Sequence, residues 1–342
     1  MNASLPRFLV SRVLAAAPIL VGAVIVTFVI MRVLPGDPAA LLAAGPGSGP
    51  AEIAALKHQM GLDQPILEQL ARYGREVVVG DLGRSFTTGN PVTTDLGARL
   101  PASLELTGAA LLLAALIGLP LGIGAALRPG SLLDQTSRAL AALGTALPAF
   151  VTGLGFIYLF YFRLGWAPEP IGQIDSLLTP PHAYTGLMLI DSLLARDGEA
   201  FLSALGRLML PAATMALFAL APLIRITRGA LIETLSADYI RAARALGLER
   251  RTIVVHYALS NAATPILAAL GMVFSYMLGA NVLVEKVFAW PGVSAYAVDA
   301  LMSADYAPVQ GFVLTVAALF TGVNLAVDIL QGLVNPQIVN GG

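Results

Sequence analysis

Residues 236–265 read SADYIRAARALGLERRTIVVHYALSNAATP and lie between two long apolar segments. Six of the chain's twenty basic residues fall from Arg225 to Arg251, so a very hydrophobic chain concentrates arginine in and just before this one loop. The apolar segments and the basic loop between them together decide which fold the sequence can form.

The composition is that of a membrane protein. Of the 342 residues, 57% are hydrophobic and 12% are charged, and the mean hydropathy is +0.78, whereas a soluble domain is about a quarter charged. The net charge of -1 argues against a nucleic-acid partner. The sequence contains no cysteine, which excludes disulfides, thiolate nucleophiles and cysteine-type zinc sites.

Six segments are apolar enough to cross a bilayer as helices, which takes about 20 residues. These predicted spans are 8–34, 104–127, 139–162, 208–224, 266–284 and 309–334. Some contain prolines, which membrane helices tolerate when neighbouring helices satisfy the freed backbone groups. We therefore predict an all-α polytopic membrane protein in three parts: the N-terminus and first transmembrane helix over 1–34, an extracytoplasmic segment over 35–103, and a five-helix transmembrane core over 104–342.

The basic residues predict how the spans are oriented. With both termini inside, the inner segments hold ten arginines, whereas the short outer segments and span ends hold Arg32, Arg163, Arg196, Arg207 and Lys286. The five basic residues of the long segment 35–101 carry little weight, because long segments cross the membrane regardless of charge. We therefore expect both termini and the basic loop to lie in the cytoplasm.

The outer segment 35–101 contains two short amphipathic helix patterns. The first ends at Gly61, and the second starts at Pro65 and ends at Gly80, which are the residue types that begin and end helices. These helices could lie against the outer membrane face or the mouth of a pathway, or they could form a small solvated cap.

Within the basic loop, residues 229–264, the first predicted helix starts at Ser236, a good N-cap residue. The apolar positions Tyr239, Ala242, Ala243 and Leu246 then recur at helical spacing. Because the alanines are small, this face is shallow and another surface can approach it closely. Arginines that only anchor the loop to anionic lipid would explain the same composition.

Gly247 supplies the left-handed residue that ends this helix. After it, Glu249 places a negative charge at the start of a second helix, where the helix dipole favours it. We expect this second helix to run toward Asn261, and Pro265 to open the next span. The loop is therefore predicted to be a helix-turn-helix.

The segment DYIRAARALGL resembles the EAA loop of ABC importer permeases, and residues 238–265 resemble the form found in the dipeptide/oligopeptide/nickel permease family. Other segments resemble that family's recurring sequences in the same order: RVLPGDPA, GLDQP, GDLGRSF, RLPASLELT, TGLMLIDSLL, LMLPAATMAL and VFAWPGVSAYAVDALMSADYAPVQG. The similarity covers nearly the whole chain. It implies the type I ABC importer permease fold, with six transmembrane helices and a cytoplasmic coupling helix.

The resemblance implies that the loop docks into a groove on a cytoplasmic ATPase. Arg241 stands where the general EAA pattern has glutamate, which leaves the docking role in place but puts the partner's contacting residue in doubt. Thr264 precedes Pro265 where leucine is common, a local departure. Carried over by position, the ATPase-coupling residues are Asp238, Tyr239, Arg241, Ala242, Ala243, Gly247 and Leu248.

The chain lacks an ATP site of its own. A P-loop lysine follows glycine, but Lys57 follows Leu56 and Lys286 follows Glu285. We therefore expect no cofactor and no catalysis in this chain, and a separate ATPase chain. The family resemblance implies that two partner ABC ATPase subunits bind ATP-Mg.

The resemblance implies further partners in the bacterial inner membrane. These are a second homologous permease, forming a heterodimer, and an extracytoplasmic substrate-binding protein that docks on segments 35–101 and 163–204, with membrane lipid around the spans. The cargo is expected to be di- or oligopeptides, and nickel or glutathione are alternatives within the family.

Few polar groups fall inside the predicted spans. Asn281, Asn324 and Asp328 are the candidate pathway or gate residues, because an intramembrane carboxylate is a functional candidate by default. Asp328 lies near the inner end of the sixth span, where a structural role fits as well. Glu285 and Lys286, at the outer end of the fifth span, are expected to mark the interface or outer gate and are not assigned to substrate.

Two other classes of function compete with a permease. An intramembrane protease needs a serine and a histidine, or two carboxylates, facing each other in the bilayer. His58, His182 and His256 all lie outside the predicted spans, and only Asp328 is well inside one. A secondary transporter acting alone would couple to an ion, for which the sparse intramembrane charge offers little.

Overall fold

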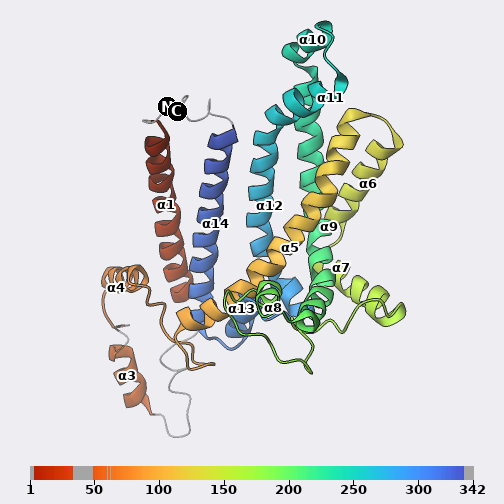
Figure 1. Cartoon of the computed structure of the whole chain (residues 1–342). Coiled ribbons are helices and arrows are strands. Elements are labelled where there is room, and N and C mark those ends of the chain that lie inside the picture. Colours follow the sequence, from red (N-terminus) through yellow and green to blue (C-terminus); the bar gives the residue numbers. More distant parts are fainter. Residues whose placement is uncertain (1–3, 34–48, 60, 62, 335–342) are drawn as a thin grey trace. The chain divides into compact units, whose positions relative to one another are not determined.

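The computed structural model describes residues 4–33, 49–59, 61 and 63–334 of the chain. In this part of the chain the structure is helical, with one isolated antiparallel bridge between Arg84 and Pro91. The prediction of an all-α protein is therefore confirmed. The helices, drawn in Figure 1, are α1 Ser4–Val33, α3 Pro50–Gln59, α4 Ile66–Val78, α5 Val92–Leu127, α6 Leu132–Ala146, α7 Ala149–Phe156, η1 Ile157–Arg163, α8 Met188–Leu194, α9 Gly198–Ser236, α10 Asp238–Ala245, α11 Arg250–Thr252, η2 Ile253–Leu259, α12 Ser260–Val287, α13 Val293–Met302 and α14 Tyr306–Val334.

Four helical stretches of the described residues are long and apolar enough to cross a membrane. They are α5, α9, the stretch from α11 into α12 over Arg250–Gly279, and α14, and a bent pair formed by α6 with α7 and η1 would make a fifth. In α1 the apolar part is the shorter stretch Ala17–Ile30. The membrane character is confirmed, while the count of six spans stays a prediction.

The predicted span 139–162 is not one straight helix, because the chain bends by 103° between α6 and α7, and its crossing of the membrane stays a prediction. Leu147 is extended, with φ -108° and ψ 136°, and α7 starts directly after Pro148. A proline disfavours helical geometry in the residue before it and is well suited to a helix start. Pro148 therefore ends one helix and begins another.

By its internal contacts the chain forms two compact units. One unit comprises residues 14–101 and 292–321, and it contains both helices predicted in the outer segment, α3 and α4. Gly61 and Gly80 follow these helices with φ of +65° and +81°, as helix-ending glycines do. Val92, Leu96, Val293 and Tyr296 form this unit's apolar core, together with Leu82, Leu100, Ala307 and Phe312 around them.

The other unit, residues 1–13, 102–291 and 322–342, contains the basic loop. Its central helix is α9, which has 39 residues and is therefore roughly 58 Å long at about 1.5 Å per residue. This exceeds the roughly 30 Å hydrocarbon core. The helix thus carries the predicted span 208–224 onward without a break to Ser236, inside the basic loop.

Helix α9 packs against α6 and α12. At Gly144 the backbone of α6 lies directly against the backbone of α9, with no side chain between them. A methyl group placed on Gly144 of α6 would lie 2.3 Å from the backbone oxygen of Leu217 on α9. Only glycine permits backbones to approach so closely, as in membrane bundles generally. Gly144 therefore sets the distance between these two helices.

Replacing Gly144 by alanine should destabilise the protein by about 1–3 kcal/mol, because the added methyl must displace the α9 backbone. The measurement is the midpoint of thermal unfolding of the detergent-solubilised protein. Gly155→Ala is the matched control, because no atom lies within 4 Å of a methyl group placed on this helical glycine. Equal midpoints for the two variants would contradict the tight contact.

Candidate functional site

The end of α9, residues 229–236, is the first part of the basic loop, and α10 follows it. The Ser236 hydroxyl donates to the Glu233 carbonyl at 2.7 Å, and Ala237 adopts an extended conformation between α9 and α10. The N-cap of α10 is therefore Ala237, and the prediction that Ser236 caps this helix is wrong. Ser236 instead bonds back into the last turn of α9, the competing bond that serine side chains commonly make.

One face of α10 is packed against the protein. Ile240 is fully buried and Ala243 is 5% exposed, and they share an apolar cluster with Leu231 of α9 and Ile253 of η2. The predicted docking face held Ala243 together with Tyr239, Ala242 and Leu246. In the structure the Ala243 side chain lies instead on the packed face, three residues from Ile240, and its role in ATPase coupling stays a prediction. The sequence pattern missed Ile240 as the main anchor.

The other face of α10 is open. Leu246 is 81% exposed, Tyr239 is 43% exposed, and Ala242 is exposed between them. Partial burial raises the pKa of the Tyr239 phenol above its usual value. Asp238 and Arg241, also exposed, form an ion pair one turn apart. This exposed face combines apolar surface with a charged edge.

Helix α10 ends in a Schellman motif at Gly247, the residue that was predicted to end this helix. Gly247 has φ +77°, its N-H donates to the Arg244 carbonyl at 3.0 Å, and the Leu248 N-H donates to the Ala243 carbonyl at 3.2 Å. These are the two bonds that define the motif. They turn the chain sharply toward α11.

The second helix of the loop is continuous with the next span. Helix α11 starts after Glu249, passes into the π-helical η2, and continues through α12, so Pro265 lies inside α12. The prediction that Pro265 opens the span is therefore wrong. Just before the proline, the side chains of Ala258 and Ala262 are buried, and the Gln331 side chain donates to the Thr264 carbonyl at 3.2 Å.

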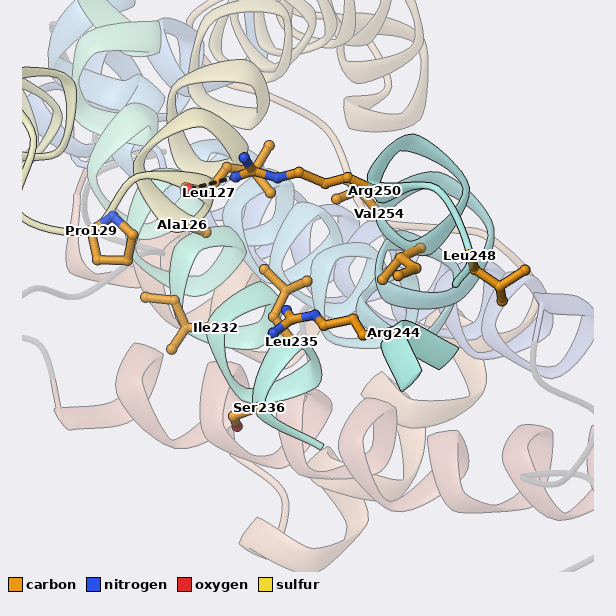
Figure 2. A pocket seen from close by; sticks show the side chains of 11 residues that line it. Ala126, Leu127, Pro129, Ile232, Leu235, Ser236, Arg244, Leu248, Arg250 and Val254 are labelled. Atoms are coloured by element: carbon orange, nitrogen blue, oxygen red, sulfur yellow. Dashed lines mark hydrogen bonds between the residues drawn. The ribbon is translucent and has the colours of Figure 1, made fainter. Parts of the chain in front are cut away.

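A groove of about 560 Å³ lies at the base of the loop, between the ends of α5 and α9 and the loop helices (Figure 2). Arg244 and Arg250 frame it, and Arg250 donates to the Leu127 carbonyl at 3.2 Å, which ties α11 to the end of α5. The remaining lining is Ala126, Leu127, Pro129, Ile232, Leu235, Ser236, Leu248, Ile253 and Val254.

A buried ion pair anchors the neighbouring part of α9. Asp134, 1% exposed at the start of α6, accepts from the Arg228 guanidinium at 2.8 and 3.1 Å and from the Gly130 N-H at 2.9 Å. Arg138 lies 3.5 Å from the same carboxylate. Such a bidentate pair fixes orientation as well as distance. In the arginine-rich segment, Arg228 as well as Arg250 therefore has a structural role.

The candidate pathway residues have separate partners. Asp328 on α14 pairs with Arg12 on α1 at 3.3 Å, which fits the structural role considered for it. Asn324, also on α14, is half-buried. Asn281 is fully buried on α12 and donates to Glu285 at 2.8 Å, one turn further along. The role of these three residues in a pathway or gate stays a prediction.

Glu285, which the sequence placed with Lys286 at the interface or outer gate, is a buried residue with structural contacts. It is fully buried and also accepts from the Ser103 hydroxyl of α5 at 2.5 Å. Nearby, the Trp290 indole N-H donates to the Ala102 carbonyl at 2.9 Å. The spacing of Asn281 and Glu285 on one helix face was the available signal. Together these bonds join the end of α12 to α5.

Comparison with known proteins gives two family matches. Residues 5–107 match the family described as "Binding-prot-dependent transport system membrane comp, N-term", and residues 118–340 match "Binding-protein-dependent transport system inner membrane component". These matches confirm the resemblance found in the sequence motifs.

Curated proteins match the chain over nearly its whole length. It is 44% identical to the "Probable D,D-dipeptide transport system permease protein DdpB" of Escherichia coli K12, over 95% of each chain. It is 39% identical to the "Di/tripeptide transport system permease protein DppB" of Pseudomonas aeruginosa, over 97% of this chain and 98% of that one. It is 36% identical to the "Dipeptide transport system permease protein DppB" of Escherichia coli K12, over 97% of this chain and 98% of that one.

Ile240→Ala should loosen α10 from the protein, because deleting this buried side chain costs about 2–5 kcal/mol. Trypsin cleavage at the loop arginines then becomes at least about tenfold faster, since each 1.4 kcal/mol changes the open population tenfold. Leu246→Ala, on the exposed face of the same helix, is the control and should be cleaved at the unmodified rate. Equal rates for both variants would show that Ile240 does not anchor the loop.

Proposed function

The chain belongs to the family of binding-protein-dependent transport system inner membrane components, and from this premise we propose that α10 is the element through which separate ATPase subunits drive it. The chain is then the permease of an ATP-driven ABC importer. The observation that carries the proposal is the two-sided character of α10: Ile240 and Ala243 fasten it to the bundle while Tyr239, Ala242 and Leu246 stay exposed.

Force transmission requires both faces of α10. An exposed apolar surface with a charged edge can dock into a groove on another protein, as amphipathic helices commonly do. The packed face passes the resulting displacement to α9 and α12, because close-packed interiors transmit strain rather than absorb it. In this role Asp238, Arg241 and the Gly247-Leu248 turn shape and orient the docking surface.

The partners follow from this arrangement. We propose two ABC ATPase subunits that bind and hydrolyse ATP-Mg, a second homologous permease that completes the membrane pathway, and an extracytoplasmic binding protein that delivers the solute. The start of α1, the end of α14 and α10 lie at one end of their unit (Figure 1). With the positive-inside bias of the sequence, this supports a cytoplasmic position for both termini and for the loop.

The proposed cargo is di- or tripeptides. The relatives described above are named as dipeptide, di/tripeptide and D,D-dipeptide permeases, and they match over nearly their full lengths. These names favour a short peptide over nickel or glutathione.

Leu246→Ser should uncouple the importer, because it removes apolar surface from the exposed face of α10 without touching the packed face. In proteoliposomes containing the whole complex, we expect peptide uptake and the stimulation of ATP hydrolysis by the binding protein to fall about tenfold, corresponding to roughly 1.4 kcal/mol of lost contact.

Leu132→Ser is the matched control, since Leu132 is a similarly exposed leucine, at 78%, at the start of α6. Its complex should work as the unmodified one does. Normal coupling of Leu246→Ser, or the same loss in both variants, would contradict a docking role for α10.

A further inference from the structure

The groove of about 560 Å³ at the base of the basic loop is a different surface from the exposed face of α10. Arg244, which lines the groove, comes one turn after the packed residue Ile240 and therefore shares its side of the helix. At about 3.6 residues per turn, Tyr239 and Leu246 project from the far side of α10. The proposed docking face therefore does not account for this groove.

Two arginines from different helices line the groove, and no carboxylate of the described residues lines it. Figure 2 shows Arg244, from α10, and Arg250, from α11, among the lining side chains. Within the described part of the chain the Arg244 guanidinium forms no hydrogen bond or ion pair, and the Arg250 guanidinium makes only its bond to the Leu127 carbonyl. A guanidinium has five N-H donors. The groove therefore offers a ligand two positive charges and several unused donors.

Much of the remaining lining is aliphatic. It includes Leu127 at the end of α5, Ile232 and Leu235 on α9, and Ile253 and Val254 of η2. The volume lies within the range of small-molecule sites, roughly 300–1,000 Å³. Cationic and aliphatic surface side by side fits an anion that also carries hydrocarbon.

The groove begins at the edge of the predicted hydrocarbon core. Leu127 is the last residue of the predicted span 104–127. Ile232 lies eight residues beyond the predicted span 208–224, which is roughly 12 Å along the helix. The lipid headgroups occupy about 5–8 Å on each side of the hydrocarbon core. The groove therefore covers the depth at which lipid phosphates lie.

We infer that this groove is a binding site for one anionic phospholipid of the cytoplasmic leaflet. Arg244 and Arg250 donate charge-assisted hydrogen bonds to its phosphate, and Ile232 and Leu235 contact its glycerol backbone and the first carbons of an acyl chain. Basic pockets between membrane helices on the cytoplasmic side bind anionic headgroups in this way. The inference goes beyond the proposed function and does not require that α10 meets an ATPase.

Binding of defined lipids to the full chain tests the inference. The delipidated protein in a neutral detergent is titrated with phosphatidylglycerol and, separately, with phosphatidylcholine, and native mass spectrometry counts the bound lipids. We expect one phosphatidylglycerol to bind about tenfold more tightly than phosphatidylcholine, because only its headgroup carries a net negative charge. Equal affinities for the two lipids would overturn the inference.

Paired variants distinguish a site from general attraction to the basic loop. Arg244→Gln combined with Arg250→Gln should weaken phosphatidylglycerol binding about tenfold. Arg241→Gln combined with Arg251→Gln removes the same charge, again one arginine from each loop helix, but at positions outside the groove. This control should bind as the unmodified protein does. Equal losses in both double variants would show that only the summed charge of the loop attracts lipid.

Arg244→Gln alone separates binding from folding, because the Arg244 side chain makes no hydrogen bond or ion pair within the described residues that the change could remove. Without lipid this variant should unfold at the same temperature as the unmodified protein, yet bind phosphatidylglycerol several-fold more weakly. Arg244→Lys should keep most of the affinity, because it keeps the charge. Unchanged binding by Arg244→Gln would show that the site is not this groove.

Two competition measurements distinguish the phospholipid from other occupants. An excess of sn-glycerol 3-phosphate should leave phosphatidylglycerol bound, whereas its displacement would make the groove a site for soluble phosphate compounds. The complex assembled with its ATPase subunits should retain the lipid. Loss of the lipid on assembly would mean that the ATPase covers the groove, and the lipid assignment would be wrong.

Discussion

The packing of Ile240 and Ala243 against the ends of α9 and α12 is the contact on which the rest of the arrangement depends. A docking helix held only by flexible chain would move without moving the bundle. Here a one-residue link, Ala237, joins α10 to the 39-residue α9, and the Schellman turn at Gly247 leads within a few residues into the helix that becomes α12. The loop is thus a rigid corner between two membrane helices.

Polar contacts extend this rigidity along α9 and α12. At the loop end, Asp134 and Arg228 join α6 to α9. At the far end of α12, the buried carboxylate of Glu285 binds Ser103 and Asn281. Removing Arg228 would leave the buried Asp134 carboxylate without its main partner, and a buried charge that loses its partner destabilises a protein strongly. Helix α9 is thereby fastened to α6, and helix α12 to α5. The proposed transmission of movement from α10 to the bundle requires rigid connections of this kind.

Much of this could be predicted from local sequence signals. The apolar lengths predicted helices that cross a membrane, and Gly61, Gly80 and Gly247 marked helix ends because their left-handed geometry depends on the residue type itself. The motifs along the chain predicted the family. Each of these signals acts within a few residues or recurs in order along the chain.

The misassigned features depend on tertiary contacts. Helical spacing placed Ala243 with Tyr239, yet which side of a short helix is buried is decided by Leu231 and Ile253, which are near α10 only in the fold. Pro148 and Pro265 are chemically the same, but the first breaks the chain by 103° while the second lies within α12. Side-chain pairs such as Glu285 with Ser103 join residues 182 positions apart, which no local pattern reveals.

The central claim is that the exposed face of α10 meets the ATPase, and proximity in the assembled complex tests it most directly. A single cysteine at Leu246 of this cysteine-free chain would be joined to lysines of the ATPase subunit with a short maleimide-succinimidyl ester cross-linker, beside a single cysteine at Leu132. The account predicts a permease-ATPase product from position 246 and little from position 132. Equal products from both positions, or none from position 246 in a complex that hydrolyses ATP and imports peptide, would contradict it.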